Sequence, residues 1–166
     1  MIKIGNIEDV ESVINIIKAA TLDMESKNIH QWDEIYPDKT VINEDIANRN
    51  LYVNEEDGII NAIIVLNEDQ TEEYSYLNWK YISQKQLVIH RLCVDPRAQG
   101  GGIARKLLKY ADDFAVKNGY GAIRLDAFTQ NERALRLYEK NGYEKVGSVQ
   151  FRKGEFYCYE KSVSVG

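Results

Sequence analysis

Residues 94–114 read VDPRAQGGGIARKLLKYADDF and join a predicted strand to a predicted helix. Three of the chain's eleven glycines stand in a row at the bend, from Gly100 to Gly102. Glycine is favoured where φ is positive or where the backbone must approach another group closely. Because one glycine is enough for a tight turn, three in succession indicate a ligand close to the main chain.

A strand that turns into a helix through glycines has the properties of an anion site. The first amides of a helix have no partners within it, and the helix dipole adds partial positive charge there. The segment Gln99–Arg105 is therefore predicted to bind phosphate, the alternative being a bend that needs glycine for geometry alone. A P-loop is excluded because no GxxxxGK precedes Ser or Thr, and a dinucleotide fingerprint fails at Arg105.

The composition predicts one soluble α/β domain over residues 1–166, with 44% hydrophobic and 28% charged residues. The net charge of −5 disfavours a nucleic-acid partner. Without a bilayer-length apolar run or a signal peptide, the chain is expected to be cytoplasmic, with no membrane partner. Cys93 and Cys158 stand among apolar or aromatic neighbours and are interpreted as buried thiols, and no metal site is expected.

Hydrophobic periodicity predicts the element order β-α-α-β-β-β-α-β-α-β-β. The predicted strands cover residues 2–5, 51–53, 59–66, 86–94, 122–127, 143–151 and 155–163. The predicted helices run from the Asn6 cap to about Met24, from Val41 to Asn48, from Ile103 to Asn118-Gly119, and from Asn131 to Asn141-Gly142. Strands 86–94 and 122–127 are expected to be parallel because a helix connects them. Residues 67–84 stay unassigned, and their aromatic residues would line a pocket, cover the sheet or form a dimer interface.

Two stretches of the sequence resemble the signatures of the GCN5-related N-acetyltransferase (GNAT) family. VDP at residues 94–96 followed by QGGGIA at residues 99–104 is similar to the acetyl-CoA motif Q/R-x-x-G-x-G/A. NERALRLYEKNGYEKVG at residues 131–147 is similar to the second motif. Together, in the family's order and spacing, they are strongly specific. The resemblance is sharp over residues 88–147 and extends to the first 80 residues only in topology.

The resemblance implies a fold and a cosubstrate. The fold is a twisted, mostly antiparallel sheet of six or seven strands flanked by about four helices. The family's fourth and fifth strands separate around the pantetheine arm of acetyl-CoA, and here these would be strands 86–94 and 122–127. The residues implied to bind acetyl-CoA are Leu92, Cys93, Val94, Gln99, Gly100, Gly101, Gly102, Ile103, Ala104, Arg105 and Asn131. A homodimer is left open.

Acetyl transfer to an amine requires a neutral amine and benefits from a proton for the leaving thiolate. A lysine-like amine has a pKa near ~10.4, so keeping it neutral at pH 7 costs about 4–5 kcal/mol. His90 is the candidate base, on a strand face that it is predicted to share with Val88, Leu92 and Val94, and the alternatives are a structural histidine or a carboxylate acting through water. Tyr138 matches the motif tyrosine that the resemblance implies is the acid.

The acceptor site is predicted from the loop between the first two helices. Trp32 and Tyr36 lie there beside Asp33 and Glu34, and the aromatic rings would hold a cation. Simple anchoring of the loop is an equal alternative. The acceptor is expected to be a small-molecule amine or a protein or peptide amine.

The function that follows is an acetyl-CoA-dependent N-acetyltransferase acting by direct attack in a ternary complex. No cysteine is placed for a covalent acetyl-enzyme, since Cys93 is expected to face away from His90. The alternative is a non-catalytic acyl-CoA-binding or sensor module of the same fold. A third hypothesis keeps the enzyme but changes the acyl group to succinyl or a longer chain.

Overall fold

The computed structural model describes residues 1–164, which form seven strands and four α-helices in the predicted order. The strands form one mostly antiparallel sheet in the order β1-β2-β3-β4-β5-β7-β6. This confirms the predicted mixed α/β architecture. The chain divides into two compact units, Met1–Leu66 with Arg91–Leu107, and Asn67–His90 with Leu108–Gly166. A single domain over residues 1–166 stays a prediction.

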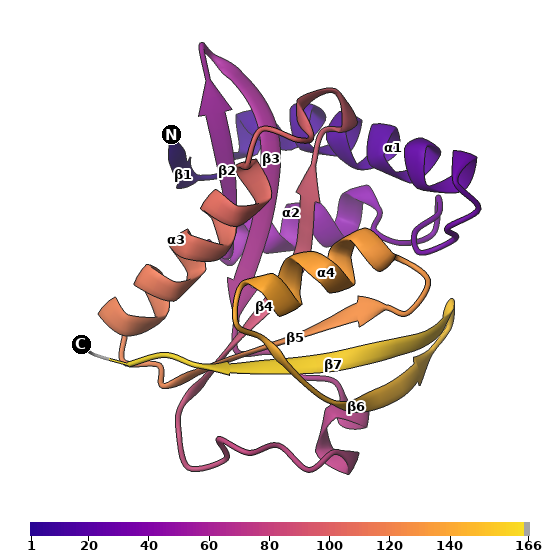
Figure 1. The fold of residues 1–166 in the computed structure, drawn as a ribbon. Helices are drawn as coiled ribbons and strands as arrows, with labels where there is room; N and C mark the ends of the chain where they lie inside the picture. Colours follow the sequence, from indigo (N-terminus) through magenta and orange to yellow (C-terminus); the bar gives the residue numbers. More distant parts are fainter. Residues whose placement is uncertain (165–166) are drawn as a thin grey trace. The chain divides into compact units, whose positions relative to one another are not determined.

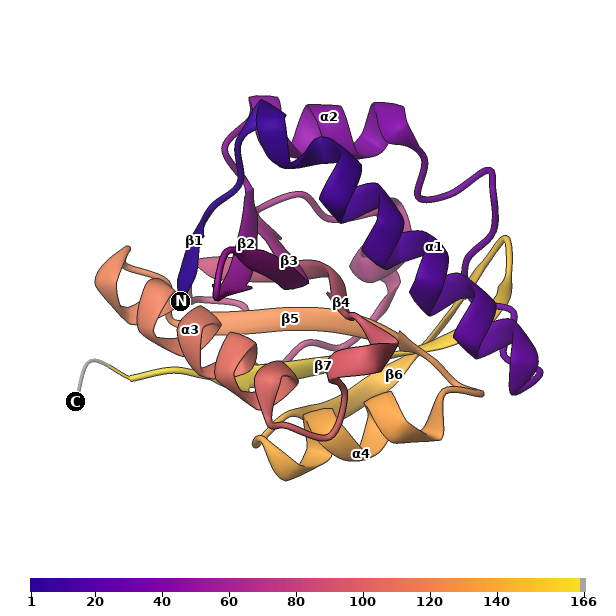
Figure 2. The ribbon, with the colours of Figure 1, turned by 90° about the horizontal axis from the view of Figure 1, so that it is seen from above.

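The first unit contains the N-terminal strands and helices. These are β1 (Ile2–Ile4), α1 (Val10–Ser26), α2 (Lys39–Ala47), β2 (Leu51–Glu56) and most of β3 (Ile59–Asn67). Both helices lie on one face of β2 and β3 (Figure 1 and Figure 2). The hairpin turn falls at Asp57-Gly58 as predicted, since both residues have the positive φ, 52° and 77°, of a two-residue turn.

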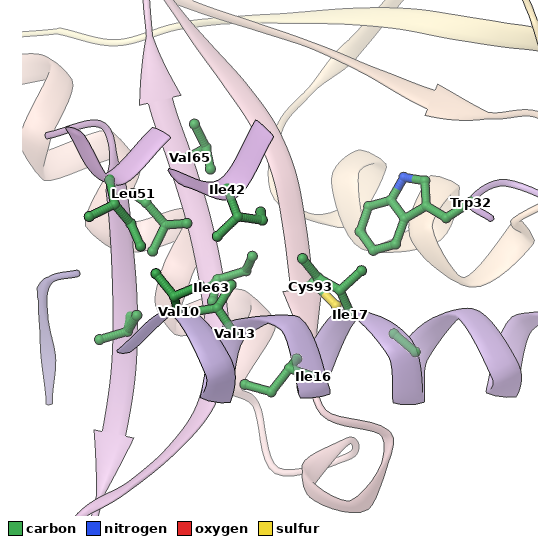
Figure 3. Close-up of a cluster of buried hydrophobic side chains, with 13 residues drawn as sticks. Val10, Val13, Ile16, Ile17, Trp32, Ile42, Leu51, Ile63, Val65 and Cys93 are labelled. Atoms are coloured by element: carbon green, nitrogen blue, oxygen red, sulfur yellow. The ribbon is translucent and has the colours of Figure 1, made fainter. Parts of the chain in front are cut away.

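The core of the first unit lies between its helices and strands. Apolar residues recur on α1 at helical spacing, as Val10, Val13 and Ile17, and all three are buried. Figure 3 shows these side chains gathered with Leu51 and Ile63 from the strands. Burying one such side chain contributes about 1.5–3 kcal/mol, so this cluster holds the two helices on the sheet.

The second unit is built on the C-terminal strands. It contains β5 (Ala122–Phe128), α4 (Glu132–Lys140), β6 (Glu144–Phe151) and β7 (Gly154–Ser162). β4 (Gln86–Val94) and α3 (Ile103–Lys117) belong partly to each unit. β5 pairs in parallel with β4 from Gln86↔Ala122 to Val88↔Arg124, as the strand–helix–strand pattern predicted. β7 pairs antiparallel with both β5 and β6.

The start of α4 and the ends of α3 and α4 occur where the sequence predicted them. Asn131 Oδ1 accepts a hydrogen bond from the amide of Ala134 at 3.2 Å and caps α4. Gly119 and Gly142 follow α3 and α4 with φ of +81° and +90°, the left-handed geometry that closes a helix. No helix of residues 1–164 has both the length and the apolarity needed to cross a bilayer.

Residues 67–84, which the sequence left unassigned, lie against β5. They contain a short 3₁₀ turn, Glu72–Tyr76, and the rings of Tyr74 and Trp79 are buried. Trp79 Nε1 donates to the carbonyl of Tyr74 at 2.7 Å, and the guanidinium of Arg124 on β5 lies 4.1 Å from the Trp79 ring. Of the three roles left open, covering the sheet accounts for these two aromatic residues.

Candidate active site

The approach to the glycine bend is fixed by Asp95, at the end of β4. Its carboxylate accepts from the amide of Arg97 at 3.0 Å and from the Arg97 guanidinium at 2.8 Å. These interactions with Arg97 outweigh burial and lower the pKa of Asp95. Asp95 also donates its amide to the carbonyl of Asn61 on β3 at 2.8 Å. The bend therefore starts from a rigid point of the first unit.

Two of the three glycines of the bend are required by backbone geometry. Gly100 and Gly102 have φ of +89° and +80°, a region that favours glycine over every other residue. A Cβ added at either position would meet no protein atom within 4 Å, so open space adjoins both. Gly101 has no positive φ, and a Cβ there would lie 3.7 Å from the carbonyl of Ala98.

The amides that follow the bend are available to a ligand. The first amide of α3 that donates a backbone hydrogen bond is that of Lys106, to the carbonyl of Gly102 at 3.1 Å. Within residues 1–164, no hydrogen bond engages the amides from Gly100 to Arg105. The Arg105 side chain is exposed and adds a positive charge. Amides without acceptors, open space and a cation together fit the diphosphate of a coenzyme A thioester.

β4 is irregular at Arg91, which has φ of +44°. A strand residue in the left-handed region interrupts the alternation of side chains. The prediction that Val88, His90, Leu92 and Val94 share one face assumed regular alternation along the whole strand, and this assumption does not hold at Arg91. Left-handed geometry costs a non-glycine residue about 1–2 kcal/mol. The surrounding contacts must therefore hold it, as is common near functional sites.

Arg91 is held by a hydrogen-bonded cluster inside the first unit. Its Nε and Nη2 donate to the two carboxylate oxygens of Asp45, on α2, at 2.8 and 2.7 Å. Its Nη1 donates to the hydroxyl of Tyr36 at 2.6 Å. The Arg91 and Asp45 side chains are only 11% and 9% exposed. Burial lowers the pKa of Arg91, but the interactions with Asp45 and Tyr36 raise it by more than burial lowers it. Arg91 therefore stays charged beside Asp45.

The two aromatic residues predicted to bind the acceptor differ in their surroundings. Trp32 is buried in the core of the first unit (Figure 3), so the expectation that its ring is open to a substrate is corrected in favour of loop anchoring. Tyr36 keeps 39% of its surface exposed. Tyr36 is therefore the more exposed of the two, and Arg91 donates a hydrogen bond to its hydroxyl.

Tyr138, the candidate acid, lies in the second unit on α4. It is buried, and its ring packs 6.0 Å from that of Tyr143 and 6.2 Å from that of Tyr159. Burial first, and then the charge of Asp126 on β5, raises the pKa of the Tyr138 phenol far above its ordinary value. The phenol is therefore protonated at neutral pH, which is the state that an acid needs.

His90, the candidate base, lies on the part of β4 that belongs to the second unit. The parallel ladder between β4 and β5 ends at Val88↔Arg124, two residues before His90. Two residues past Arg124 stands Asp126, which the sequence did not single out. An acidic residue in a β-strand gives little indication of its role until the pairing register is known.

The two cysteines are buried thiols, and they were considered as nucleophiles and as metal ligands. Cys93 and Cys158 are both buried, and burial raises the pKa of each thiol to about 12. Neither is therefore a nucleophile at neutral pH. Over residues 1–164, no cluster of three or more His, Cys, Asp or Glu side chains is arranged to hold a metal ion.

Comparison with known proteins shows to which family this chain belongs. Residues 16–143 match the model of the Acetyltransferase (GNAT) family. The chain belongs to this family. A Staphylococcus aureus Mu50 protein provisionally assigned as an acetyltransferase shares 31% identity and a TM-score of 0.79, with 99% of each chain covered. The yncA protein of Salmonella typhimurium, provisionally assigned as an acetyltransferase and solved with its cofactor acetyl-CoA, is 19% identical, with a TM-score of 0.72 over 100% of this chain and 95% of that one.

The curated relatives match over shorter stretches. The N-alpha-acetyltransferase RimI of Mycobacterium tuberculosis is 44% identical over 59 residues, which are 36% of this chain and 35% of RimI. This GNAT chain therefore aligns with about a third of that relative. YesJ of Bacillus subtilis, named an uncharacterized N-acetyltransferase, is 21% identical over 95% of this chain and 87% of its own length.

Proposed function

We propose that this GNAT protein transfers the acetyl group of acetyl-CoA to a primary amine by direct attack in a ternary complex. The observation that carries the proposal is the run of amides from Gly100 to Arg105 that lack acceptors, beside two glycines with positive φ. Acetyl-CoA would supply an activated acetyl thioester. The protein would supply binding, orientation and proton transfer.

The coenzyme would be held mainly by backbone groups. The bend from Gln99 to Ala104 would bind the diphosphate, and exposed Arg105 would add a positive charge. The backbone of Leu92, Cys93 and Val94 would bind the pantetheine arm and stabilise negative charge on the thioester oxygen. Asn131, which caps α4 through its Oδ1, would also contact the pantetheine arm.

Two side chains of the second unit would move protons. His90 would take a proton from the acceptor amine, since its ordinary pKa suits neutral pH. Tyr138 would donate its phenolic proton to the departing thiolate, and the raised pKa keeps that proton in place until the thiolate forms. The gap between the two acidities limits this acceleration.

The acceptor is proposed to be a small-molecule amine or the amine of a protein or peptide. RimI is named for action on N-alpha amines, which supports the second class. The exposed ring of Tyr36 would contact the acceptor in either case. We further propose that the protein works in the cytoplasm, where acetyl-CoA is available, and a homodimer stays open.

Calorimetry with acetyl-CoA and a thiol-release assay with a panel of amines test the proposal. Acetyl-CoA is expected to bind and to raise the melting temperature as its concentration exceeds Kd, because a ligand of the folded state stabilises it. Thiol release is expected only when an amine is added. Binding without turnover for every amine would favour the acyl-CoA-binding module, and faster turnover with succinyl-CoA would change the acyl group. No heat from any coenzyme A thioester would overturn the proposal.

A further inference from the structure

The carboxylate of Asp126 is held on one side only. The buried hydroxyl of Tyr74 donates to Asp126 Oδ2 at 2.7 Å. Within residues 1–164, no hydrogen bond reaches its second oxygen, Oδ1. Opposite Asp126 on β7 stands Cys158, a neutral thiol at physiological pH. Asp126 therefore has one fixed oxygen and one that is free for a ligand.

Among the described residues of the second unit, no cation is paired with Asp126. Arg124 lies two residues earlier on the same face of β5, but its register partner on β7 is the carboxylate Glu160. The Arg124 guanidinium is further engaged by Gln70, at 2.6 Å, and by the Trp79 ring. The negative charge of Glu160 therefore compensates the positive charge of Arg124, and the negative charge of Asp126 is not compensated.

The groups packed around Asp126 are neutral at pH 7. Tyr74 comes from the 67–84 segment, Tyr138 from α4 and Cys158 from β7, and burial raises the pKa of all three. Burial raises the pKa of Asp126 too, against the hydrogen bond from Tyr74, which lowers it. A partly buried carboxylate without a cation costs free energy, and such groups concentrate at functional sites.

Asp126 and His90 follow the same end of the β4–β5 ladder. β4 and β5 are parallel, and their last pair is Val88↔Arg124. His90 and Asp126 each lie two residues beyond this pair along their own strand. The charge of Asp126 also acts on Tyr138. The carboxylate, the candidate base and the candidate acid thus belong to one part of the second unit.

We propose that Asp126 Oδ1 binds the positively charged amino group of the acceptor, so that the substrates are cationic primary amines. This inference rests on the proposed acetyltransferase function. The ammonium group would donate a charge-assisted hydrogen bond to Oδ1 while Tyr74 orients the carboxylate through Oδ2. The cation would compensate the buried charge, and His90 would then receive the proton that makes the amine a nucleophile.

Kinetics with two amines of the same skeleton test the charge requirement. Ethylamine is a cation at neutral pH, and 2,2,2-trifluoroethylamine is largely uncharged. Asp126→Asn is expected to raise the KM for ethylamine by about 10-fold or more, the loss of one charge-assisted bond, with KM for acetyl-CoA unchanged. For trifluoroethylamine the change stays within about 2-fold. Asp113→Asn, on the exposed face of α3, is the matched control and leaves both values unchanged.

Equal changes in KM for the two amines, or no change for either, would overturn the inference. Tyr74→Phe is a second variant, which removes the orienting hydroxyl but keeps the charge. It is expected to raise the KM for ethylamine by less than Asp126→Asn does. An effect larger than that of Asp126→Asn would contradict the assignment.

Two measurements that need no turnover separate this inference from the proposed function. In protein labelled with ¹³C at Asp carboxyls, the Asp126 resonance, identified by its loss in Asp126→Asn, is expected to shift with ethylammonium and not with ethanol. Asp126→Asn is also expected to raise the melting temperature by about 2–4 °C, because it removes an uncompensated charge. A fall in melting temperature, or a resonance that ignores ethylammonium, would overturn the inference even in an active enzyme. A responsive resonance in a protein without turnover would uphold the site and reject the acetyltransferase proposal.

Discussion

At the scale of the residue, the glycine bend separates two requirements that the sequence could not distinguish. Gly100 and Gly102 need their positive φ, whereas Gly101 does not. A Cβ at Gly100 or Gly102 would meet no protein atom within 4 Å, so a side chain there would occupy the space in which we propose the diphosphate binds. Under that proposal, backbone geometry and ligand approach both favour glycine at these two positions.

Gly102→Val is expected to weaken acetyl-CoA binding and to destabilise the protein by about 1–2 kcal/mol, the cost of left-handed geometry for an L side chain. Calorimetry gives the affinity and urea unfolding gives the stability. Gly101→Ala is the control, and its unfolding free energy is expected to change by less than that of Gly102→Val. Unchanged coenzyme affinity in Gly102→Val would count against a phosphate site at the bend.

Tyr138→Phe is expected to lower kcat by about 10-fold or more, within the range of general acid catalysis, with little change in Kd for acetyl-CoA. Since its pKa is raised, the phenol stays protonated as the pH rises, and the wild-type protein should show no loss of activity from Tyr138 between pH 7 and about 9. Tyr143→Phe is the control, because the Tyr143 ring packs against that of Tyr138 and its buried hydroxyl forms no hydrogen bond in the described chain. Equal kcat in Tyr138→Phe and wild type would remove the acid role.

At the scale of the element, β4 is shaped by a side chain from α2 and another from the α1–α2 loop. Asp45 and Tyr36 together occupy Nε, Nη1 and Nη2 of Arg91. That cluster stabilises the left-handed residue which precedes Leu92, the first of the amides proposed to bind the thioester. The loop that carries Tyr36 is thus linked to the irregular part of β4 through a hydrogen bond to Arg91.

Asp45→Ala is expected to destabilise the first unit by about 3–5 kcal/mol, because it leaves the Arg91 cation buried without its negatively charged partner. Tyr36→Phe removes one hydrogen bond to the same cation and is expected to cost about 1 kcal/mol. Urea unfolding measures both. The double variant Asp45→Ala with Arg91→Met should regain part of the loss, since no buried charge is left. A double variant less stable than Asp45→Ala alone would show that the pair does not act through its charge.

At the scale of the whole molecule, each compact unit contains one buried thiol, Cys93 in the first and Cys158 in the second. A pKa of about 12 leaves only about one thiolate in 10⁴ at pH 8. Reaction with a thiol reagent therefore requires a unit to open. The two cysteines are natural reporters of that opening.

Each thiol is expected to react with an aromatic disulfide reagent at least about 100-fold more slowly in the folded protein than in urea. Cys158→Ala isolates the reporter of the first unit, and Cys93→Ala isolates that of the second. Absorbance of the released thiolate follows the reaction. Rapid labelling of either single-cysteine variant without denaturant would contradict the buried state of that residue.

The amino-acid sequence by itself determined the element order, the hairpin turn, the helix caps, the parallel β4–β5 pair and the place of the glycine bend. These features depend on interactions over a few residues, such as the period of apolar side chains, the φ of glycine and the capping amides. Each of them could therefore be predicted from a short segment of the sequence.

Only the tertiary structure decided which side chains meet. Arg91 bonds to Asp45 and Tyr36 across 46 and 55 residues, and Tyr74 bonds to Asp126 across 52. Packing between distant segments also buried Trp32 in the core of the first unit and placed residues 67–84 against β5. It left the Asp126 carboxylate without a paired cation. Local propensity carries no information over such separations, because charge balance and burial depend on strand register and on packing between distant segments.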